Sequence, residues 1–477
     1  MPDVPSVLLL AGLIALGGLV EGVRRSRRAG PVDLFHPLIF GSGYVAAVCL
    51  VPCAWFWTAP AREAARVPIP LADLSPDTPA LMALAVVGFT LGCAVPFAAR
   101  TTASVRSVDP GRLLLVGRLL LLLPLALACW GVVSGAVRAY GSAPAGLGIH
   151  SFNIVRDLVA PVAVVLILSA RLRAGQRLFS PLDGALVAGY VVLVGLTGER
   201  GAALTVMIAV LVFLTRTPGG TVRAGLGFLA VAGFVVGVVL YRNAANGTPG
   251  SSVVGMTVLD SVPLTVTTGV IAERVTGDQV LDGATILAGV LRLLPGFLSR
   301  SLFGPPTDTG VAKFREIAEQ NGDLGWNFSL PAEGALNFGA VGVFLLPFLV
   351  GLLLAFLYAR FDARGSRVGQ LFYVLAVASL PVVFRTDAQS ALKVLLYPAA
   401  LLAMICLGMS LAQRHRTGGP QAAGAGGGTL RQTEGRSAEV SPISTISHYL
   451  PVRWVVELGR ALQVTRRRRV PAPGPRP

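Results

Sequence analysis

The chain is poor in charged residues and in histidine, and these shortages argue against several classes of protein. Only 13% of its 477 residues are charged, and it has 4 histidines. A water-soluble domain ordinarily carries about twice that share of charged residues, so much of this chain must face something other than water. The outer segments identified below contain no cluster of metal-ligand residues, so we expect neither a metal nor a cofactor.

Cysteine is also scarce, and its placement does not predict a disulfide framework. Each of the 5 cysteines lies inside an apolar run, at Cys49, Cys53, Cys93, Cys129 and Cys406. In such surroundings a free cysteine behaves as a small apolar side chain. We therefore interpret all five as membrane-buried thiols that form no bridge and bind no metal.

Apolar runs, by contrast, are abundant. Hydrophobic residues make up 53% of the chain, and its mean hydropathy is +0.70. Runs of about 17 to 25 apolar residues recur, the length of a helix that crosses roughly 30 Å of hydrocarbon. We predict an all-α, polytopic transmembrane helical bundle. Its expected spans number about eleven: 5–23, 37–57, 80–99, 112–133, 157–172, 182–197, 201–215, 224–241, 338–359, 369–385 and 391–411.

The arginines predict how this bundle is oriented. The net charge is +16, but the basic residues lie between the apolar runs and in the C-terminal tail, which does not favour nucleic acid as a partner. Positively charged short loops stay in the cytoplasm, and arginines occupy every second connection. The N-terminus is therefore expected outside the cytoplasmic membrane and the C-terminus inside. On the outer face the alternation leaves 58–79, 134–156, 198–200, 242–337 and 386–390.

One outer connection, 243–337, is much longer than the others. At about 95 residues it exceeds an ordinary loop, so it is either functional or disordered. It contains an apolar segment, 281–303, that is interrupted by Arg292, Pro295 and Arg300. We interpret this segment as interfacial or re-entrant, because a further span would invert the later alternation of arginines.

The composition changes at Gln413, where glycine, arginine, serine and proline replace the apolar residues. We divide the chain into a transmembrane domain, 1–412, and a cytoplasmic, basic and mostly disordered tail, 413–477. Within the tail, 451–464 fits a short amphipathic helix, and the four arginines that follow suit anionic membrane lipid. A solvated basic tail without a binding role fits equally well.

Arginines gather at the predicted outer face. Several converging guanidinium groups suit a phosphate or pyrophosphate, because each offers a planar, permanently charged, bidentate donor. The alternative for each arginine is that it anchors a helix end or pairs with a nearby carboxylate. Arg118, inside a predicted span, is expected to be structural and to reach back to water at the cytoplasmic side. The outward arginines are Arg200, Arg242 and Arg385 at helix ends, and Arg292, Arg300 and Arg315 in the large loop.

Two short stretches resemble a known family. GLTGERGAALTVM, and later PAEGALNFGAVGVFLLPFL, look like the Wzy-type O-antigen and oligosaccharide repeat-unit polymerases. Those proteins have a turn in which Arg and Gly follow a small residue, a large outer loop, and a Glu and an Asn-Phe-Gly that lead into a late helix. The departure here is Glu199, which stands where the small residue is expected. The matching positions are Arg200, Gly201, Glu333, Asn337, Phe338 and Gly339.

The resemblance implies a membrane glycosyltransferase that polymerises undecaprenyl-pyrophosphate-linked oligosaccharide repeat units. Positive charge would hold the departing pyrophosphate, and a base would accept the proton of the attacking sugar hydroxyl. Glu333 and Arg200 are the expected catalytic residues, and Asn337 and the other outward arginines would bind substrate. The partners implied are membrane lipid, a flippase and a chain-length regulator. The alternative for Glu333 is an ordinary glutamate in the first turn of a helix.

Three other functions remain open. An O-antigen-ligase-like transferase would share the chemistry, but that family has a histidine in its large outer loop, and none lies in 243–337. A transporter of polysaccharide or lipid-linked glycan usually shows internal repeats and charge near the bilayer midplane, which we do not find. The third alternative is a scaffold for envelope assembly.

The orientation leads to a first test. Reporter domains fused at residue 62 and at residue 420 are expected to give an outer and a cytoplasmic signal, respectively, because the arginine-rich connections stay inside. A cytoplasmic signal from the first fusion would contradict the topology and the placement of the outward arginines.

Overall fold

The computed structural model describes residues 4–29, 32–58, 75–97, 109–133, 149–197, 200–217, 220–245, 262–275, 279–294, 301, 308–317, 328–362 and 369–417. The chain forms two compact units, Met1–Cys406 and Leu407–Pro477. Of the second unit only 407–417 is described, so the predicted amphipathic helix 451–464 lies outside the described residues.

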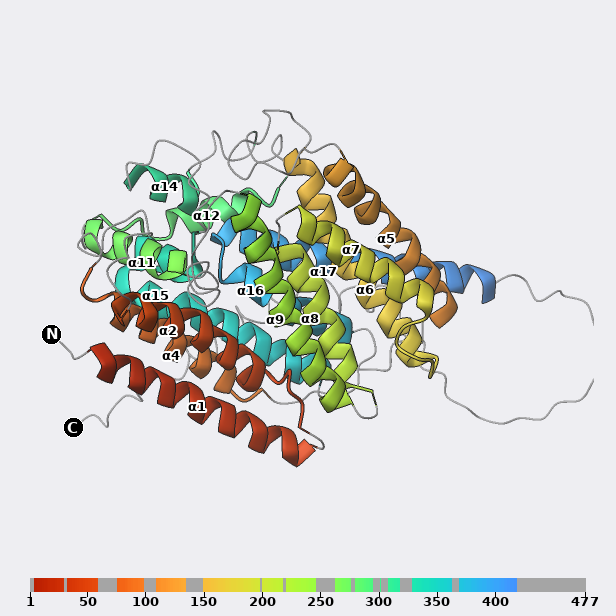
Figure 1. The fold of residues 1–477 in the computed structure, drawn as a ribbon, viewed down its shortest axis with the longest axis horizontal. Coiled ribbons are helices and arrows are strands. Elements are labelled where there is room, and N and C mark those ends of the chain that lie inside the picture. The colour runs from red at the N-terminus through yellow and green to blue at the C-terminus, as the bar shows by residue number, and fades with distance from the viewer. Residues whose placement is uncertain are drawn as a thin grey trace, which may run out of the picture. The chain divides into compact units, whose positions relative to one another are not determined.

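Helices make up all the regular secondary structure of these ranges (Figure 1). A π-helical turn, Pro37–Gly41, leads into α2, and another, Tyr358–Asp362, follows α15. The α-helices are α1 (Val4–Ala29), α2 (Ser42–Thr58), α4 (Thr78–Ala94), α5 (Pro110–Val133), α6 (Ile149–Arg173), α7 (Pro181–Leu196), α8 (Gly201–Thr215), α9 (Gly220–Ala245), α11 (Val262–Arg274), α12 (Ala284–Leu291), α14 (Gly310–Ile317), α15 (Leu330–Leu357), α16 (Gly369–Val383) and α17 (Ala388–Thr417).

A helix overlaps each of the predicted spans, and the fold is that of an all-helical membrane protein. Within the described ranges, six helical segments are long and apolar enough to cross a membrane: Val4–Arg28, Pro37–Trp55, Pro110–Val133, Val222–Tyr241, Leu330–Arg360 and Ala388–Ala412. Four further apolar helices are shorter, at 10–17 residues: α4, α7, α8 and α16. The prediction of about eleven crossings is not confirmed by these lengths and stays a prediction.

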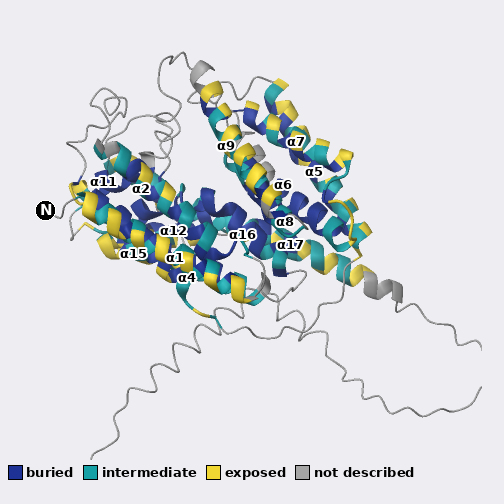
Figure 2. Ribbon diagram, turned by 60° about the horizontal axis from the view of Figure 1, so that its bottom comes forward, coloured by how far each residue is buried: buried dark blue, intermediate teal, exposed yellow. Residues whose placement is uncertain are grey.

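The distribution of apolar surface supports a lipid-facing exterior. Residues 159–170 of α6 and most of α16 are buried, whereas α1 and α9 carry exposed faces (Figure 2). On α1 the exposed face is apolar, with Leu9 65%, Leu13 53% and Val20 61% exposed. An apolar strip of this extent is rare on the water-facing surface of a monomeric protein.

Glycines allow α4 and α15 to pack backbone against backbone. A Cβ atom on Gly88 would collide with the carbonyl oxygen of Phe344, and one on Gly92 with that of Phe348. From the opposite helix, Gly351 approaches the carbonyl of Phe89 in the same way. Close approach at small residues is how helices associate in a membrane, where lipid competes for every apolar side chain.

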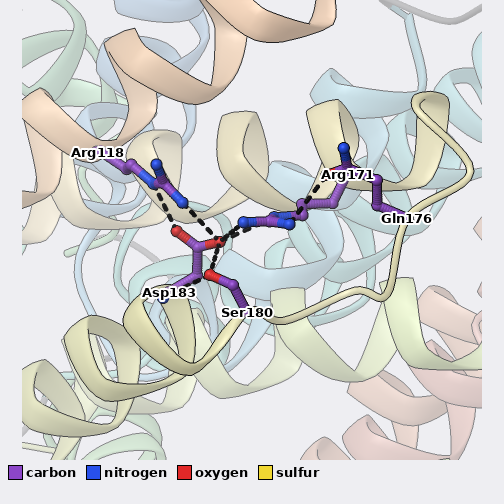
Figure 3. A network of polar contacts seen from close by, with 5 residues as sticks. All are labelled: Arg118, Arg171, Gln176, Ser180 and Asp183. Carbon is purple, nitrogen blue, oxygen red and sulfur yellow. Dashed lines mark hydrogen bonds and ion pairs between the residues drawn. The ribbon is translucent and has the colours of Figure 1, made fainter.

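A buried carboxylate joins α5, α6 and α7 (Figure 3). The Asp183 side chain is 0% exposed and accepts from Arg118 Nε at 2.7 Å. Arg171 Nη2 lies 2.6 Å from the same carboxylate, and Ser180 Oγ donates to it at 2.7 Å. Arg118, which we expected to be structural and to reach water, is 30% exposed, and its guanidinium group pairs with this buried carboxylate. Replacing Asp183 would break both ion pairs, and removing one partner of a buried ion pair typically costs about 3–5 kcal/mol.

Helix α15 begins earlier than the predicted span 338–359. Ser329 caps it by accepting from the backbone N–H of Ala332 at 3.2 Å, and proline occupies its first turn. The helix breaks at Phe338 and at Gly339, whose φ of 58° lies in the left-handed region that favours glycine. Glu333 and Asn337, which we placed in the outer loop, thus belong to a short helical segment before the break.

The glycine packing leads to a second test. Gly92→Ala is expected to lower the free energy of unfolding by about 1–3 kcal/mol, because the new methyl group has no room beside Phe348. Gly233→Ala on α9 is the matched control, since nothing lies within 4 Å of a Cβ atom there. Thermal unfolding of the two purified variants in detergent measures the difference. Equal melting temperatures would show that α4 and α15 separate readily at this point.

Candidate functional site

The Glu333 carboxylate lies where the first turns of four helices meet. Glu333 itself is in the first turn of α15, and its carboxylate contacts Thr285 in the first turn of α12. It also accepts from the backbone N–H of Ala388, the first residue of α17, and it lies 2.8 Å from where a Cβ atom would stand on Gly310, the first residue of α14. Helix N-termini carry partial positive charge, so this arrangement stabilises a negative charge in an apolar setting. We call these residues, with Asn337, the Glu333 centre.

Both carboxylate oxygens of Glu333 accept a hydrogen bond, and the residue is 0% exposed. Thr285 Oγ1 donates to Oε1 at 2.7 Å, and the Ala388 backbone N–H donates to Oε2 at 2.7 Å. On a third side, a Cβ atom on Gly310 would lie 2.8 Å from Oε2, so a larger residue there would press on the carboxylate. The carboxylate is therefore held by segments 48 and 55 residues away in the sequence.

Asn337 determines the direction of the hydrogen bonds. Its Nδ2 donates to the Glu333 carbonyl oxygen at 2.9 Å and to Thr285 Oγ1 at 2.7 Å. Its Oδ1 accepts from the Thr285 backbone N–H at 3.3 Å. A carbonyl oxygen can only accept, so the bond to Glu333 identifies which end of the amide is Nδ2. The Thr285 oxygen receives a proton from Asn337, and its own proton points to Glu333.

Helix α12 packs against α15 and α17 at the Glu333 centre. The Leu281 N–H donates to the Leu336 carbonyl at 3.1 Å, next to the break of α15. A Cβ atom on Gly289 would lie 2.9 Å from the Gln389 backbone nitrogen, and Tyr397 Oη donates to the Leu293 carbonyl at 3.1 Å. Eight residues of helix rise only about 12 Å, well short of a bilayer crossing.

Two of the predicted arginines end adjacent helices. Arg200 directly precedes α8, and Arg385 follows α16 in the turn to α17. A Cβ atom on Gly201 would lie 3.5 Å from Val382 of α16, so these two helix ends are neighbours. Arg385 also lies three positions before Ala388, whose N–H binds Glu333.

The other predicted arginines are more scattered. Arg292 follows α12 directly, and both Arg292 and Asp387 interact electrostatically with Lys393 of α17. Arg315 is exposed on α14. Arg242 lies in α9, but its side chain is outside the described residues, and Arg300 is outside them altogether. Among the described residues, Arg385 and Arg292 therefore lie near the start of α17. Whether Arg242 and Arg300 also lie there stays a prediction.

Sequence reasoning identified Glu333 and Asn337 but not Thr285, Gly310 or Ala388. Thr285 and Gly310 lie in glycine-containing stretches and Ala388 follows a short polar turn, and nothing in the local sequence marks any of the three. In the part of the chain that the structure describes, no group of three or more His, Cys, Asp or Glu residues is placed to hold a metal ion.

No protein-family model, curated protein or solved structure matches this chain. The resemblance to the Wzy-type polymerases rests on the two short stretches alone, and the Glu333 centre has to be interpreted from its own chemistry.

Proposed function

We propose that the chain is a membrane glycosyltransferase that polymerises undecaprenyl-pyrophosphate-linked oligosaccharide repeat units into a surface polysaccharide. The reaction would take place at the outer face of the cytoplasmic membrane. The observation that carries the proposal is the fully buried Glu333 at the break of α15, bonded to Thr285 and Ala388. A carboxylate enclosed in a membrane protein is costly and is a functional candidate by default. Glu333 and its neighbour Asn337 are also the residues that match the motif of the Wzy-type polymerases.

The proposed reaction balances without a metal or a cofactor. A sugar hydroxyl of one chain attacks the anomeric carbon of another, and the bond from that carbon to the pyrophosphate oxygen breaks. The electron pair of that bond leaves with the lipid pyrophosphate, while Glu333 accepts the proton of the attacking hydroxyl. Arginines stabilise the departing charge, with Arg200 and Arg385 at adjacent helix ends.

The acceptor hydroxyl must reach a carboxylate that is enclosed in this structure. On the side of Gly310, the described residues make no hydrogen bond to the carboxylate, whereas Thr285 and Ala388 hold it from the other sides. We propose that the acceptor enters from this side when α14 moves away. Helix α14 is held by Phe314 against Phe328, with ring centroids 5.8 Å apart, and by Arg274 Nη1, which donates to the Ile317 carbonyl at 2.8 Å.

One observation also favours a transporter of lipid-linked glycan. Helix α15 is interrupted at Phe338 and Gly339, close to a buried polar cluster, and discontinuous helices form the substrate sites of many transporters. The two functions differ in what a cell without the protein accumulates. A missing polymerase leaves single repeat units on the outer leaflet, whereas a missing transporter leaves them on the inner leaflet. An O-antigen-ligase-like transferase would instead leave long, untransferred polymer.

The glycan profile of cells provides the third test. Deleting the gene is expected to remove long polymer and to retain single lipid-linked repeats. Glu333→Gln is expected to reproduce the deletion at normal protein levels, because an amide cannot accept the proton. Glu316→Gln is the control: this glutamate lies on α14 of the same outer segment, and its side chain is 66% exposed. Long polymer at parental levels from Glu333→Gln would exclude Glu333 as the base.

The outward arginines provide the fourth test. Lysine in place of Arg200, Arg242 or Arg385 keeps the charge but removes the bidentate fork, so most polymerisation should be lost while the protein accumulates normally. Arg177→Lys is the control, since Arg177 is exposed in a predicted cytoplasmic connection. Parental glycan length in all three variants would identify these arginines as helix anchors and leave the pyrophosphate to Arg292, Arg300 and Arg315.

A further inference from the structure

Thr285 is a polar residue in an otherwise apolar helix. Helix α12 reads ATILAGVL, and Thr285 within it is only 2% exposed. A threonine hydroxyl commonly donates to a carbonyl of the preceding helical turn, as Thr205 does to Gly201 at 2.9 Å. Thr285 lies in the first turn of its helix, so its hydroxyl is available to a partner in another segment. That partner is the Glu333 carboxylate.

The Thr285 hydroxyl cannot rotate to donate its proton to another acceptor. Asn337 Nδ2 donates to Thr285 Oγ1, and the Asn337 amide is itself fixed by the Glu333 carbonyl. The Thr285 proton is therefore left for Glu333 Oε1. The backbone N–H of Thr285 is bonded to Asn337 Oδ1, which holds the first turn of α12 in register with α15.

We propose that Thr285 is a positioning residue for Glu333, and that α12 of the outer segment thereby forms part of the site. The inference rests on the proposed function. Ala388 fixes Oε2 and Thr285 fixes Oε1, so the carboxylate plane cannot rotate about its terminal bond. Without Thr285, Oε1 loses its donor and the base departs from the orientation that the acceptor hydroxyl requires. Misplacement of a reacting group by about 1 Å can reduce a rate roughly 100-fold.

Thr285→Val tests this directly, because valine has nearly the same shape and lacks the donor. We expect kcat to fall about 10- to 100-fold with KM unchanged, which corresponds to one hydrogen bond to a charged group. Thr285→Ser restores the hydroxyl and is expected to restore kcat. Thr205→Val is the matched control, since it removes a buried hydroxyl that donates within its own helix.

The assay uses the full chain, purified in detergent, and lipid-linked repeat units extracted from cells that lack the protein. A parental kcat for Thr285→Val, or a raised KM with kcat unchanged, overturns the inference. If Thr285→Val does not accumulate, the kcat of Thr285→Cys is measured instead, because a thiol is similar in size to the hydroxyl but is a weak donor. An intermediate kcat for that variant supports the inference, and a parental kcat overturns it.

Glu333→Gln, assayed in parallel, separates this inference from the proposed function. An inactive Glu333→Gln with a parental Thr285→Val rejects the positioning role and keeps the proposed base. An active Glu333→Gln rejects the base and the positioning role together. Absence of polymer from the parent protein rejects the polymerase itself.

Discussion

The structure around Glu333 depends on one constraint: a carboxylate inside apolar helical protein has to be fully bonded. Glu333 meets this requirement through donors from α12 and α17 and through the partial positive charge of helix N-termini. Each donor comes from a different segment, so those segments have to meet at one point. The early start of α15, its break at Gly339 and the packing of α12 are all compatible with that meeting.

Asp183 is a second buried carboxylate under the same constraint, but it is stabilised in a different way. There the buried carboxylate is paired with two arginines, which join α5, α6 and α7. Glu333 has no arginine within bonding distance among the described residues; neutral donors hold it instead. Two guanidinium groups neutralise the charge of the Asp183 carboxylate, whereas the neutral donors of Glu333 stabilise its charge without supplying a full counter-charge. This contrast favours Glu333 as the chemically active group and Asp183 as a structural one.

Sequence reasoning predicted the helices well, because a long apolar run in a chain of this composition has few alternatives. It could not establish how many helices cross the membrane, since α4, α7, α8 and α16 are short. Glu333 was identified through its motif, but its partners Thr285 and Ala388 are 48 and 55 residues away, and local sequence does not encode such contacts. For the same reason Asp183, 65 residues away, could not be predicted as the partner of Arg118.

Reconstitution tests the central claim most directly. The purified protein in liposomes would receive lipid-linked repeat units extracted from cells that lack it, and both glycan length and released undecaprenyl pyrophosphate would be measured. A polymerase is expected to produce lipid-linked chains of several repeats, with one lipid pyrophosphate released for each new linkage. Repeat units that remain single, whether they stay in place or move intact between leaflets, would contradict it.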